Sequence, residues 1–395
     1  MSNMSFMEKL LDGVEVEWKS LGEVGEFIRG NGMQKKDFIE TGFPAIHYGQ
    51  IYTRYGLSAD KTFTYISEDL ANKLRKANKN DLLLATTSEN DEDVVKPLAW
   101  LGGEAVISGD MMLFRHDQNV KYLAYYFQTE AFQTQKRKYI NGAKVRRVSK
   151  DDLAKIVVPI PKKLDIQTEI VRILDVFTEL TAELTAGLTA ELTARKKQYN
   201  YYRDQLLSFE ESEVEWKTLG EIATIGTGSR NTNEAVLDGQ YPFFVRSQEP
   251  RAIDSFEFDE TAIITAGDGV GVGKVFHYVS GKYALHQRAY RIVVRDDHVN
   301  SKFLFYYIRN NFARYLTKIS VHASVTSLRK PMFEKYPIPI LPLAEQGRIV
   351  TILDKFDTLT SSISEGLPRE IELRQKQYEY YRNLLLSFPK PEVEA

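Results

Sequence analysis

The chain repeats itself, and this internal duplication constrains the fold more than any other feature of the sequence. Residues 15–23, Glu-Val-Glu-Trp-Lys-Ser-Leu-Gly-Glu, recur 198 positions later at residues 213–221, with threonine in place of serine. Much of residues 167–209 recurs 179 positions later at residues 346–388, including Ile-Leu-Asp, Tyr-Tyr-Arg and Leu-Leu-Ser-Phe. We therefore predict one structural framework present in two copies.

Between the repeated segments lie two stretches that share little sequence, at about residues 24–158 and 222–336. The 179-residue spacing also maps residues 213–215 onto residues 392–394, close to the last residue. The pattern is therefore cyclic, and we expect the two ends of the chain to lie near one another. The alternative is an old duplication that left no functional symmetry.

Hydrophobic spacing predicts two long helices. Within residues 165–209, apolar side chains recur every three or four positions from Ile166 to Leu192, as on one face of a helix. Residues 181–192 comprise three four-residue units of the type Thr-Ala-Glu-Leu, with Gly187 replacing one glutamate. Glycine costs about 1 kcal/mol inside a helix, so we expect packing contacts to hold that position.

The second helix is expected at about residues 344–387, with a break near Gly366 and Pro368, because proline fits the first turn of a helix but not its interior. Two such helices in one chain most simply pair antiparallel; independent partner-binding helices are the alternative. Within the globular stretches we predict strands at residues 81–87, 261–266 and 290–294 and helices at residues 122–132 and 301–316.

The predicted fold class is α+β, with two globular domains separated by two long antiparallel coiled-coil helices in a pseudo-twofold, cyclic arrangement. We divide the chain into five segments: an N-terminal framework segment (1–14), a first globule (15–160), a first helix with the four-residue units (161–212), a second globule (213–340), and a second helix with a C-terminal framework segment (341–395).

Composition excludes several classes of function. The 52 Lys and Arg residues nearly balance the 54 Asp and Glu residues, for a net charge of −2, so the chain is not uniformly basic. The absence of cysteine rules out disulfides, thiolate metal sites and cysteine nucleophiles. The N-terminal residues lack the pattern of a signal peptide, and there is no apolar run of membrane-spanning length. We expect a cytoplasmic protein.

No catalytic motif is complete. Residues 267–274 resemble a phosphate-binding loop, but Asp268 occupies a required glycine position and Val275 follows where Ser or Thr is needed. A β-hairpin or a bulge near a DNA backbone is the favoured interpretation. The six histidines lack zinc-ligand spacing, and residues 91–93, Asp-Glu-Asp, are read as a solvated loop rather than a cation site. We therefore expect no catalytic residues, no metal and no cofactor in this chain.

Positive charge is concentrated at equivalent places in the two globules. Residues 130–150 hold seven cations and one acid, and residues 301–330 hold six cations and no acid. Tyrosines are interleaved with them, namely Tyr139, Tyr306, Tyr307 and Tyr315. Two equivalent basic patches indicate nucleic-acid binding; two solvated helix faces are the alternative.

Side chains that can contact bases or phosphates accompany these patches in loops of both globules. In the first globule the candidates are Arg29, Gln34, Lys35, Lys36, His47, Tyr48, Gln50, Tyr52, Arg54, Thr86, Thr87, Ser88, Asn90, Lys144, Arg146 and Arg147. In the second they are Arg230, Asn231, Arg246, Ser247, Gln248, Lys274, His286, Gln287, Arg288, His322, Ser324, Thr326 and Arg329.

Taken together, these segments resemble one known family over the full length of the chain. The Glu-Val-Glu-Trp-Lys-x-Leu-Gly-Glu segments, the Gln-x-x-Ile-Val-x-Ile-Leu-Asp helix starts at Gln167 and Gln346, the Gln-Tyr-x-Tyr-Tyr-Arg helix ends and the Thr-Ala-Glu-Leu units are similar to those of type I restriction–modification specificity subunits (HsdS), most of all the IC branch.

This resemblance implies a non-catalytic subunit whose two target-recognition domains each read one half of a bipartite, asymmetric DNA site. It further implies that the helices set the unread spacer and dock two adenine-methyltransferase (HsdM) subunits, with restriction/translocase (HsdR) subunits added for cleavage. S-adenosylmethionine, ATP and Mg²⁺ would then be bound by those partners. The rival hypothesis is a coiled-coil scaffold that reads no DNA; a self-contained modification enzyme is strongly disfavoured.

The four-residue units bear on the spacer. Four helical residues add about 6 Å, which is at most about two base pairs of B-DNA. The resemblance implies about one base pair per unit, so three units predict a spacer of about seven rather than about six unread base pairs. Gly187 departs from the repeat and weakens the expected stiffness of the helix.

Overall fold

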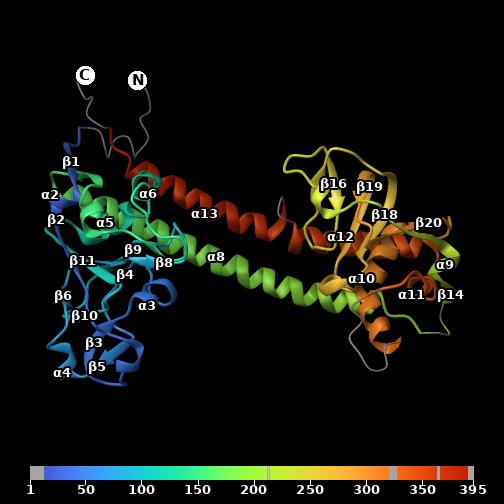
Figure 1. Ribbon diagram of the computed structural model, residues 1–395, viewed down its shortest axis with the longest axis horizontal. Coiled ribbons are helices and arrows are strands. Elements are labelled where there is room, and N and C mark those ends of the chain that lie inside the picture. The colour runs from blue at the N-terminus through green and yellow to red at the C-terminus, as the bar shows by residue number, and fades with distance from the viewer. Residues whose placement is uncertain (1–12, 211, 213, 320–326, 363–364, 390–395) are drawn as a thin grey trace. The chain divides into compact units, whose positions relative to one another are not determined.

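The computed structural model describes residues 13–210, 212, 214–319, 327–362 and 365–389 (Figure 1). The chain forms two compact units. Unit 1 combines residues 1–186 with residues 372–395, and unit 2 comprises residues 187–371. Each unit therefore contains one globule together with helical segments from both copies of the framework. The α+β class predicted from the sequence is confirmed.

Unit 1 begins with β1 (Val16–Ser20), which pairs antiparallel with β13 (Val157–Pro161). The helical turn α2 (Leu21–Val24) follows, and the Glu23 carboxylate accepts hydrogen bonds from the Ser20 backbone N–H and hydroxyl at 2.8 and 2.6 Å. This capping box satisfies donors that would otherwise be unpaired at a helix start.

Two sheets and a short ribbon form the rest of the first globule. The larger sheet has the order β2-β11-β7-β9-β4, with bounds Gly25–Arg29, Met111–His116, Leu82–Ala85, Lys96–Trp100 and Ser58–Ala59. The smaller has the order β5-β3-β10-β6, with bounds Thr64–Ile66, Phe43–Ile46, Ala105–Ile107 and Lys76–Ala77. The ribbon joins β8 (Thr87–Ser88) to β12 (Arg146–Arg147). The expected strand at residues 81–87 is confirmed as β7.

The helices of the first globule are short: η1 (Lys35–Asp37), α3 (Tyr48–Thr53), α4 (Glu68–Ala71), α5 (Val120–Tyr126), α6 (Glu130–Arg137) and α7 (Lys150–Ala154). The single helix predicted at residues 122–132 is wrong in one respect. It is divided into α5 and α6 because the Thr129 side chain accepts a hydrogen bond from the Phe132 N–H and so starts a new helix.

Unit 2 repeats this plan. Its strands are β14 (Glu215–Thr218), β15 (Ala223–Thr227), β16 (Tyr241–Phe244), β17 (Arg251–Ile253), β18 (Phe258–Ala266), β19 (Phe276–Leu285), β20 (Ala289–Val294) and β21 (Pro337–Ile340). Its short helices are α9 (Leu219–Ile222), η2 (Thr232–Glu234), η3 (Gly269–Gly271) and α11 (Lys330–Glu334), with a longer α10 (Ser301–Ile319). Six strands form one sheet in the order β15-β20-β18-β19-β16-β17. The strands predicted at 261–266 and 290–294 are confirmed as parts of β18 and β20.

The long helices are α8 (Leu164–Leu206), α12 (Leu343–Ser361) and α13 (Gly366–Leu385). The break predicted near Gly366 and Pro368 is confirmed: Gly366 has a left-handed φ of +79°, and Pro368 lies in the first turn of α13. In unit 1 the C-terminal part of α13 lies alongside the first half of α8 (Figure 1), and the Phe177 ring stacks on Tyr381 at 5.5 Å.

In unit 2 the C-terminal part of α8 packs on α12, where Tyr199 and Tyr202 lie 6.0 and 5.9 Å from the Phe356 ring. The first half of α8 thus meets α13, and the end of α8 meets α12, which precedes α13 in the chain. The expected antiparallel pairing is confirmed.

Each globule is attached to the following helix by the same buried contacts. Gln167 is fully buried; its Oε1 accepts from the Asn119 N–H at 3.0 Å and its amide donates to the Pro161 carbonyl at 3.2 Å. In unit 2, Gln346 accepts from the Asn300 N–H at 2.8 Å and donates to the Leu341 carbonyl at 2.7 Å. The repeated glutamines therefore satisfy backbone groups of the globule from within the helix.

A second repeated contact lies two helical turns further along. The Tyr125 hydroxyl donates to Asp175 at 2.8 Å, and the Tyr306 hydroxyl donates to Asp354 at 2.5 Å. Lys121 and Lys302 form ion pairs with these same carboxylates at 2.6 and 3.1 Å. The Ile-Leu-Asp motif therefore recurs because its aspartate anchors the first helix after each globular sheet.

The two ends of the described chain are joined within unit 1. The Trp18 indole N–H donates to the Pro389 carbonyl at 3.0 Å, and Leu385, Leu386 and Phe388 are buried in the core of the first globule. The cyclic sequence pattern therefore corresponds to a closed structure, as expected. In unit 1 the C-terminal segment packs on the globule as residues 199–209 do in unit 2.

Gly187 does not meet the expectation that packing holds it. A Cβ at this position would have no neighbouring atom within 4 Å, although α8 continues through it. Leu180 and Leu184, on the expected apolar seam, are about half exposed at 49% and 51%. Gly187 therefore lies on the exposed side of α8, whereas Thr181, Thr185, Leu188 and Leu192 form a partly buried face of the same stretch.

We predict that Gln167→Leu will destabilise unit 1 by about 1–3 kcal/mol, because the Asn119 N–H and the Pro161 carbonyl would be buried without partners. Urea unfolding monitored by tryptophan fluorescence measures the change. Gln375→Leu, on the exposed surface of α13, is the control and should be nearly neutral. Equal stability of the two variants would contradict the assigned role of Gln167.

Candidate nucleic-acid interface

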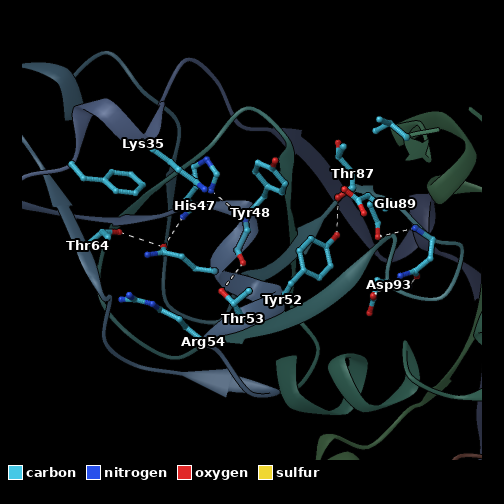
Figure 2. Close-up of a pocket in the computed structure, with 16 residues that line it drawn as sticks. Lys35, His47, Tyr48, Tyr52, Thr53, Arg54, Thr64, Thr87, Glu89 and Asp93 are labelled. Carbon is cyan, nitrogen blue, oxygen red and sulfur yellow. Dashed lines mark hydrogen bonds between the residues drawn. The ribbon is translucent and has the colours of Figure 1, made fainter. Parts of the chain in front are cut away.

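The first globule contains a hollow of about 770 Å³ beside α3 (Figure 2). Nine of the residues proposed from sequence line it: Lys35, His47, Tyr48, Gln50, Tyr52, Arg54, Thr87, Ser88 and Asn90. Figure 2 shows Tyr48 and Tyr52 of α3 between Lys35 and His47 on one side and Thr87 and Glu89 on the other. Residues from η1, α3, β8 and the following loop, separated by up to 55 positions, are thus brought to one surface.

His47 and Gln50 form the floor of this hollow. His47 precedes α3, where its Nδ1 accepts from the Gly49 N–H at 3.2 Å, and Gln50 Oε1 accepts from the His47 N–H at 3.0 Å. Both side chains are buried. Burial, reinforced by the charge of Lys35, lowers the pKa of His47. The imidazole is therefore neutral at pH 7, and these two residues position α3.

Tyr52 ties α3 to the adjacent strands. Its hydroxyl lies 2.9 Å from the Thr87 carbonyl and 3.1 Å from the Ala85 carbonyl, and burial raises its pKa. The Arg54 guanidinium lies 5.6 Å above the Phe63 ring at the rim. Of the proposed residues that line this hollow, Lys35, Arg54 and Asn90 are exposed and so are available to a ligand; Thr53, Glu89 and Val145 are exposed there as well.

A second hollow of about 650 Å³ in the same globule is lined by three more of the proposed residues, Arg29, Thr86 and Arg147, and again by Thr87. Arg75, which sequence reasoning did not select, and Lys150 of the basic segment also line it. Arg29 donates from Nε to the Gly109 carbonyl at 3.2 Å, and exposed Arg147 belongs to β12. Arg146 forms an ion pair with Asp91 at 2.7 Å. Gln34, Lys36 and Lys144 are exposed but line neither hollow.

The loop after β8, which lines the first hollow, is held by a buried lysine. Lys136 of α6 is fully buried, and its ammonium donates to the carbonyls of Glu92 and Val94, both at 2.9 Å. The basic segment at residues 130–150 is therefore not a continuous surface patch. Lys136 supports the loop from inside the protein, and Arg137 forms an ion pair with Glu130 at 3.0 Å.

The basic segment at residues 301–330 also needs correction. Lys302 and Arg309 form ion pairs with Asp354 and Asp357 of α12, at 3.1 and 3.7 Å. Tyr306 and Tyr307 are buried in the core, and Tyr315 packs edge-on against Tyr336 at 4.8 Å. This face of α10 therefore contacts the framework helix. Arg314, Lys318, Arg329 and Lys330 are exposed, and Arg309 is exposed although it is paired.

In the second globule, two proposed arginines converge on one carboxylate. Arg246 and Arg288 contact Asp268 at 2.7 and 3.1 Å, and Arg246, Ser247 and Asp268 line a hollow of about 340 Å³. Burial acts to raise the pKa of Asp268, but hydrogen bonds from Arg246 and then Arg288 outweigh it and lower that pKa. Sequence reasoning missed Asp268 as a site residue because it was considered only as a failed phosphate-loop position.

The other candidates in this globule have varied surroundings. Gln287 donates to the Asn231 side-chain oxygen at 2.6 Å, and Arg230 pairs with Glu234 at 3.0 Å. His286 is buried, whereas Gln248, Lys274 and Arg329 are exposed. His322, Ser324 and Thr326 lie outside the described residues. Of the hairpin or bulge expected at residues 267–274, the hairpin is confirmed, since this stretch connects antiparallel β18 and β19. Its expected place near a DNA backbone stays a prediction.

Among the described residues, no group of three or more His, Asp or Glu side chains is arranged to hold a metal ion. In residues 91–93, Asp91 pairs with Arg146 and Asp93 accepts from the Asn90 amide at 2.8 Å. No described helix is long and apolar enough to cross a membrane.

Comparison with known proteins assigns the family. The type I restriction modification DNA specificity domain matches residues 13–194 and again residues 211–373. The chain belongs to this family. The chain is 38% identical to the specificity subunit of the EcoR124I/EcoR124II type I restriction enzyme of Escherichia coli, over 100% of this chain and 99% of that protein. It is 33% identical to a putative type I restriction enzyme specificity subunit of Haemophilus influenzae, over 98% of this chain and 99% of that one.

Solved structures show the same fold at low sequence identity. A chain from a study of complex assembly and conformational transition in the type I restriction–modification system matches with a TM-score of 0.65 and 16% identity, covering 95% of this chain and 98% of that one. The HsdS subunit of Thermoanaerobacter tengcongensis matches with a TM-score of 0.53 and 16% identity, covering 94% and 95%. The resemblance inferred from the repeated segments is confirmed: the protein is a type I specificity subunit.

We predict a pH effect from Lys136. Burial and the charge of Arg137 lower its pKa from 10.5 to about 8, so between these values the unfolded chain binds more protons than the folded chain. Lys136 therefore makes the free energy of unfolding rise with pH over this window, by about 1–3 kcal/mol. Chemical unfolding at pH 8 and pH 10.5 should show a smaller increase in the free energy of unfolding for Lys136→Met than for the wild type. Lys138→Met, exposed at the end of α6, should keep the wild-type increase; equal slopes in both variants would contradict the prediction.

Proposed function

We propose that this subunit reads a bipartite, asymmetric DNA sequence, with one half of the site recognised by each globule. The observation that carries the proposal is how the two copies differ. Contacts that attach the globules to the helices recur, as in the Gln167 and Gln346 pair. The side chains around the hollows do not recur: a tyrosine-rich surface in one globule corresponds to an Arg–Asp–Arg cluster in the other. Two globules that are attached in the same way but carry different surfaces are suited to bind two different DNA sequences.

The exposed cations near the hollows supply the electrostatic part of this function. Arg147, Lys144 and Lys35 in the first globule, and Lys274 and Arg329 in the second, can neutralise phosphates, which orient a protein on DNA without reading its sequence. Base readout then falls to polar side chains within the hollows. The cytoplasm, where the chromosome lies, is the compartment that this role requires.

We further propose that two identical methyltransferase subunits dock on the repeated helix ends. Tyr201 and Tyr380 occupy equivalent positions and are 59% and 63% exposed, each edge-on to its neighbouring tyrosine at 5.4 Å. Two exposed tyrosines contribute little to the fold, so their presence in both copies points to a partner that binds twice. The chain itself supplies no reaction step; S-adenosylmethionine, ATP and Mg²⁺ belong to the methyltransferase and restriction subunits.

The experiment that tests the reading function is genome-wide mapping of N6-methyladenine by single-molecule sequencing, in cells with the cognate methyltransferase subunit and with or without this chain. We expect a split motif that depends on the chain, with about seven unread base pairs between the halves. Arg146→Ala and Arg329→Ala should weaken DNA association; the scaffold hypothesis expects no change. Methylation that is absent or independent of this chain would exclude the proposal.

Docking is tested separately by native mass spectrometry of the purified complex. Tyr201→Ser or Tyr380→Ser alone should reduce bound methyltransferase from two copies to one, and the double variant should reduce it further. Leu237→Ser is the matched control, because Leu237 is 99% exposed but lies in a globule outside the repeated segments. Two bound copies in the double variant would show that the tyrosines are not part of the docking surface.

A further inference from the structure

Arg246, Asp268 and Arg288 form one cluster at the hollow of the second globule. Arg246 follows β16, Asp268 follows β18, and Arg288 precedes β20, so three separate strands bring them together. The carboxylate contacts one guanidinium through each oxygen, at 2.7 Å to Arg246 Nη1 and 3.1 Å to Arg288 Nη1. Asp268 is 22% exposed, whereas the arginine side chains are 42% and 63% exposed. The carboxylate is thus recessed, and the two guanidinium groups face solvent.

Backbone hydrogen bonds identify the equivalent positions in the first globule. The His286 N–H donates to the Phe244 carbonyl, as the Ser108 N–H donates to the Ile46 carbonyl, which aligns Arg246 with Tyr48. The Gly267 N–H donates to the Arg288 carbonyl, as the Thr86 N–H donates to the Asp110 carbonyl. Asp268 and Arg288 therefore correspond to Thr87 and Asp110.

At these positions the backbone is preserved and the chemistry is exchanged. Thr87 donates to Asp110 at 3.2 Å in the first globule, whereas Arg288 donates to Asp268 in the second. The same two backbone positions therefore carry threonine and aspartate in the first globule and aspartate and arginine in the second. The fold does not require an Arg–Asp–Arg cluster at this place, so the cluster is free to serve a ligand.

The cluster is also poorly explained as a stabilising device. Exposed ion pairs contribute about 0–1 kcal/mol. What the carboxylate does achieve is orientation: a guanidinium has five N–H donors in a planar fork, and a contact on one side fixes the direction of the others. His286 adds to this, because its Nδ1 accepts from the Arg288 N–H at 3.0 Å and so fixes the backbone that carries the arginine.

A fixed arginine fork matches one base in particular. Guanine presents O6 and N7 as two adjacent acceptors in the major groove, and a bidentate arginine is the commonest specific contact to it. An arginine without a fixed orientation can contact a phosphate equally well. The recessed aspartate therefore distinguishes these arginines from the exposed lysines near the same hollow.

We propose that Arg246 and Arg288 read guanine in the half-site of the second globule, and that Asp268 is the residue that positions them. This inference rests on the proposed reading function, and it specifies that this half-site contains at least one G·C pair contacted in the major groove.

The test uses the full chain assembled with its methyltransferase subunit. The wild-type methylation map first supplies the bipartite motif, which checks the reading function itself. Competition binding then compares the unmodified duplex with duplexes in which 7-deazaguanine replaces one guanine of the motif at a time. This base lacks the N7 acceptor. We expect wild type to lose about 5-fold or more in affinity at one or more guanines of one half only. Arg246→Lys or Arg288→Lys keeps the positive charge but lacks the forked guanidinium group. These variants should bind the duplex with guanine and the duplex with 7-deazaguanine equally well at the affected position.

Asp268→Ala distinguishes orientation from charge. If Asp268 positions the arginines, this variant should lose discrimination at the same guanine while its affinity for unrelated DNA stays equal or increases, because a negative charge has been removed. Asp259→Ala, an exposed carboxylate at the opposite end of β18, should leave discrimination unchanged. Thermal melting verifies that each variant is folded; should Asp268→Ala melt early, the two lysine variants decide.

Three results would overturn the inference while leaving the reading function intact. The first is a bipartite motif in which the half-site affected by these variants contains no G·C pair. The second is wild-type binding that is insensitive to 7-deazaguanine throughout the motif. The third is an equal loss of affinity for all sequences in the lysine variants, which would make these arginines phosphate contacts.

Discussion

The attachment of each globule to the helix that follows it depends on one buried glutamine. Gln167 and Gln346 satisfy, from within a helix, a backbone N–H and a carbonyl of the preceding globule. Neither group could be buried unpaired without destabilising the structure. Because the side chain is held at both of its polar ends, the direction in which the helix leaves the globule is determined. The tyrosine–aspartate contacts at Asp175 and Asp354 reinforce it two turns later.

This attachment explains why the contacts at the helix junctions are the same in the two copies while other surfaces differ. The glutamine and aspartate contacts require particular side chains, so they are the same in both halves. The hollows impose no such requirement, and their residues differ although the backbone bonds around them correspond. A framework of this kind allows the ligand preference of one globule to change without altering its junction with the helices. This is the property that the proposed reading of two different half-sites requires.

Much of the fold follows from local and periodic features of the sequence. Helix α8 has apolar residues at helical spacing and no internal proline, and Gly366 with Pro368 marks the break before α13. The split at Thr129 could not be anticipated, because threonine is compatible with both a helix interior and an N-cap, and tertiary packing selects between them. Clusters of charge were misleading for a related reason. Lys136 is charged and yet buried, because two carbonyls of a distant loop accept hydrogen bonds from its ammonium group.

By itself, the sequence determined the duplication, the cyclic order of the segments and the family, since these depend on residue identity and spacing along the chain. Only the tertiary structure decided which charged residues are exposed and which are paired within the protein. It placed Lys302 and Arg309 against α12, and it brought Asp268, dismissed as part of a failed motif, between two arginines that are 22 and 20 positions away. The physical reason is that ion pairs and hydrogen bonds join side chains from different strands, and proximity across a sheet leaves no periodic signal in the sequence.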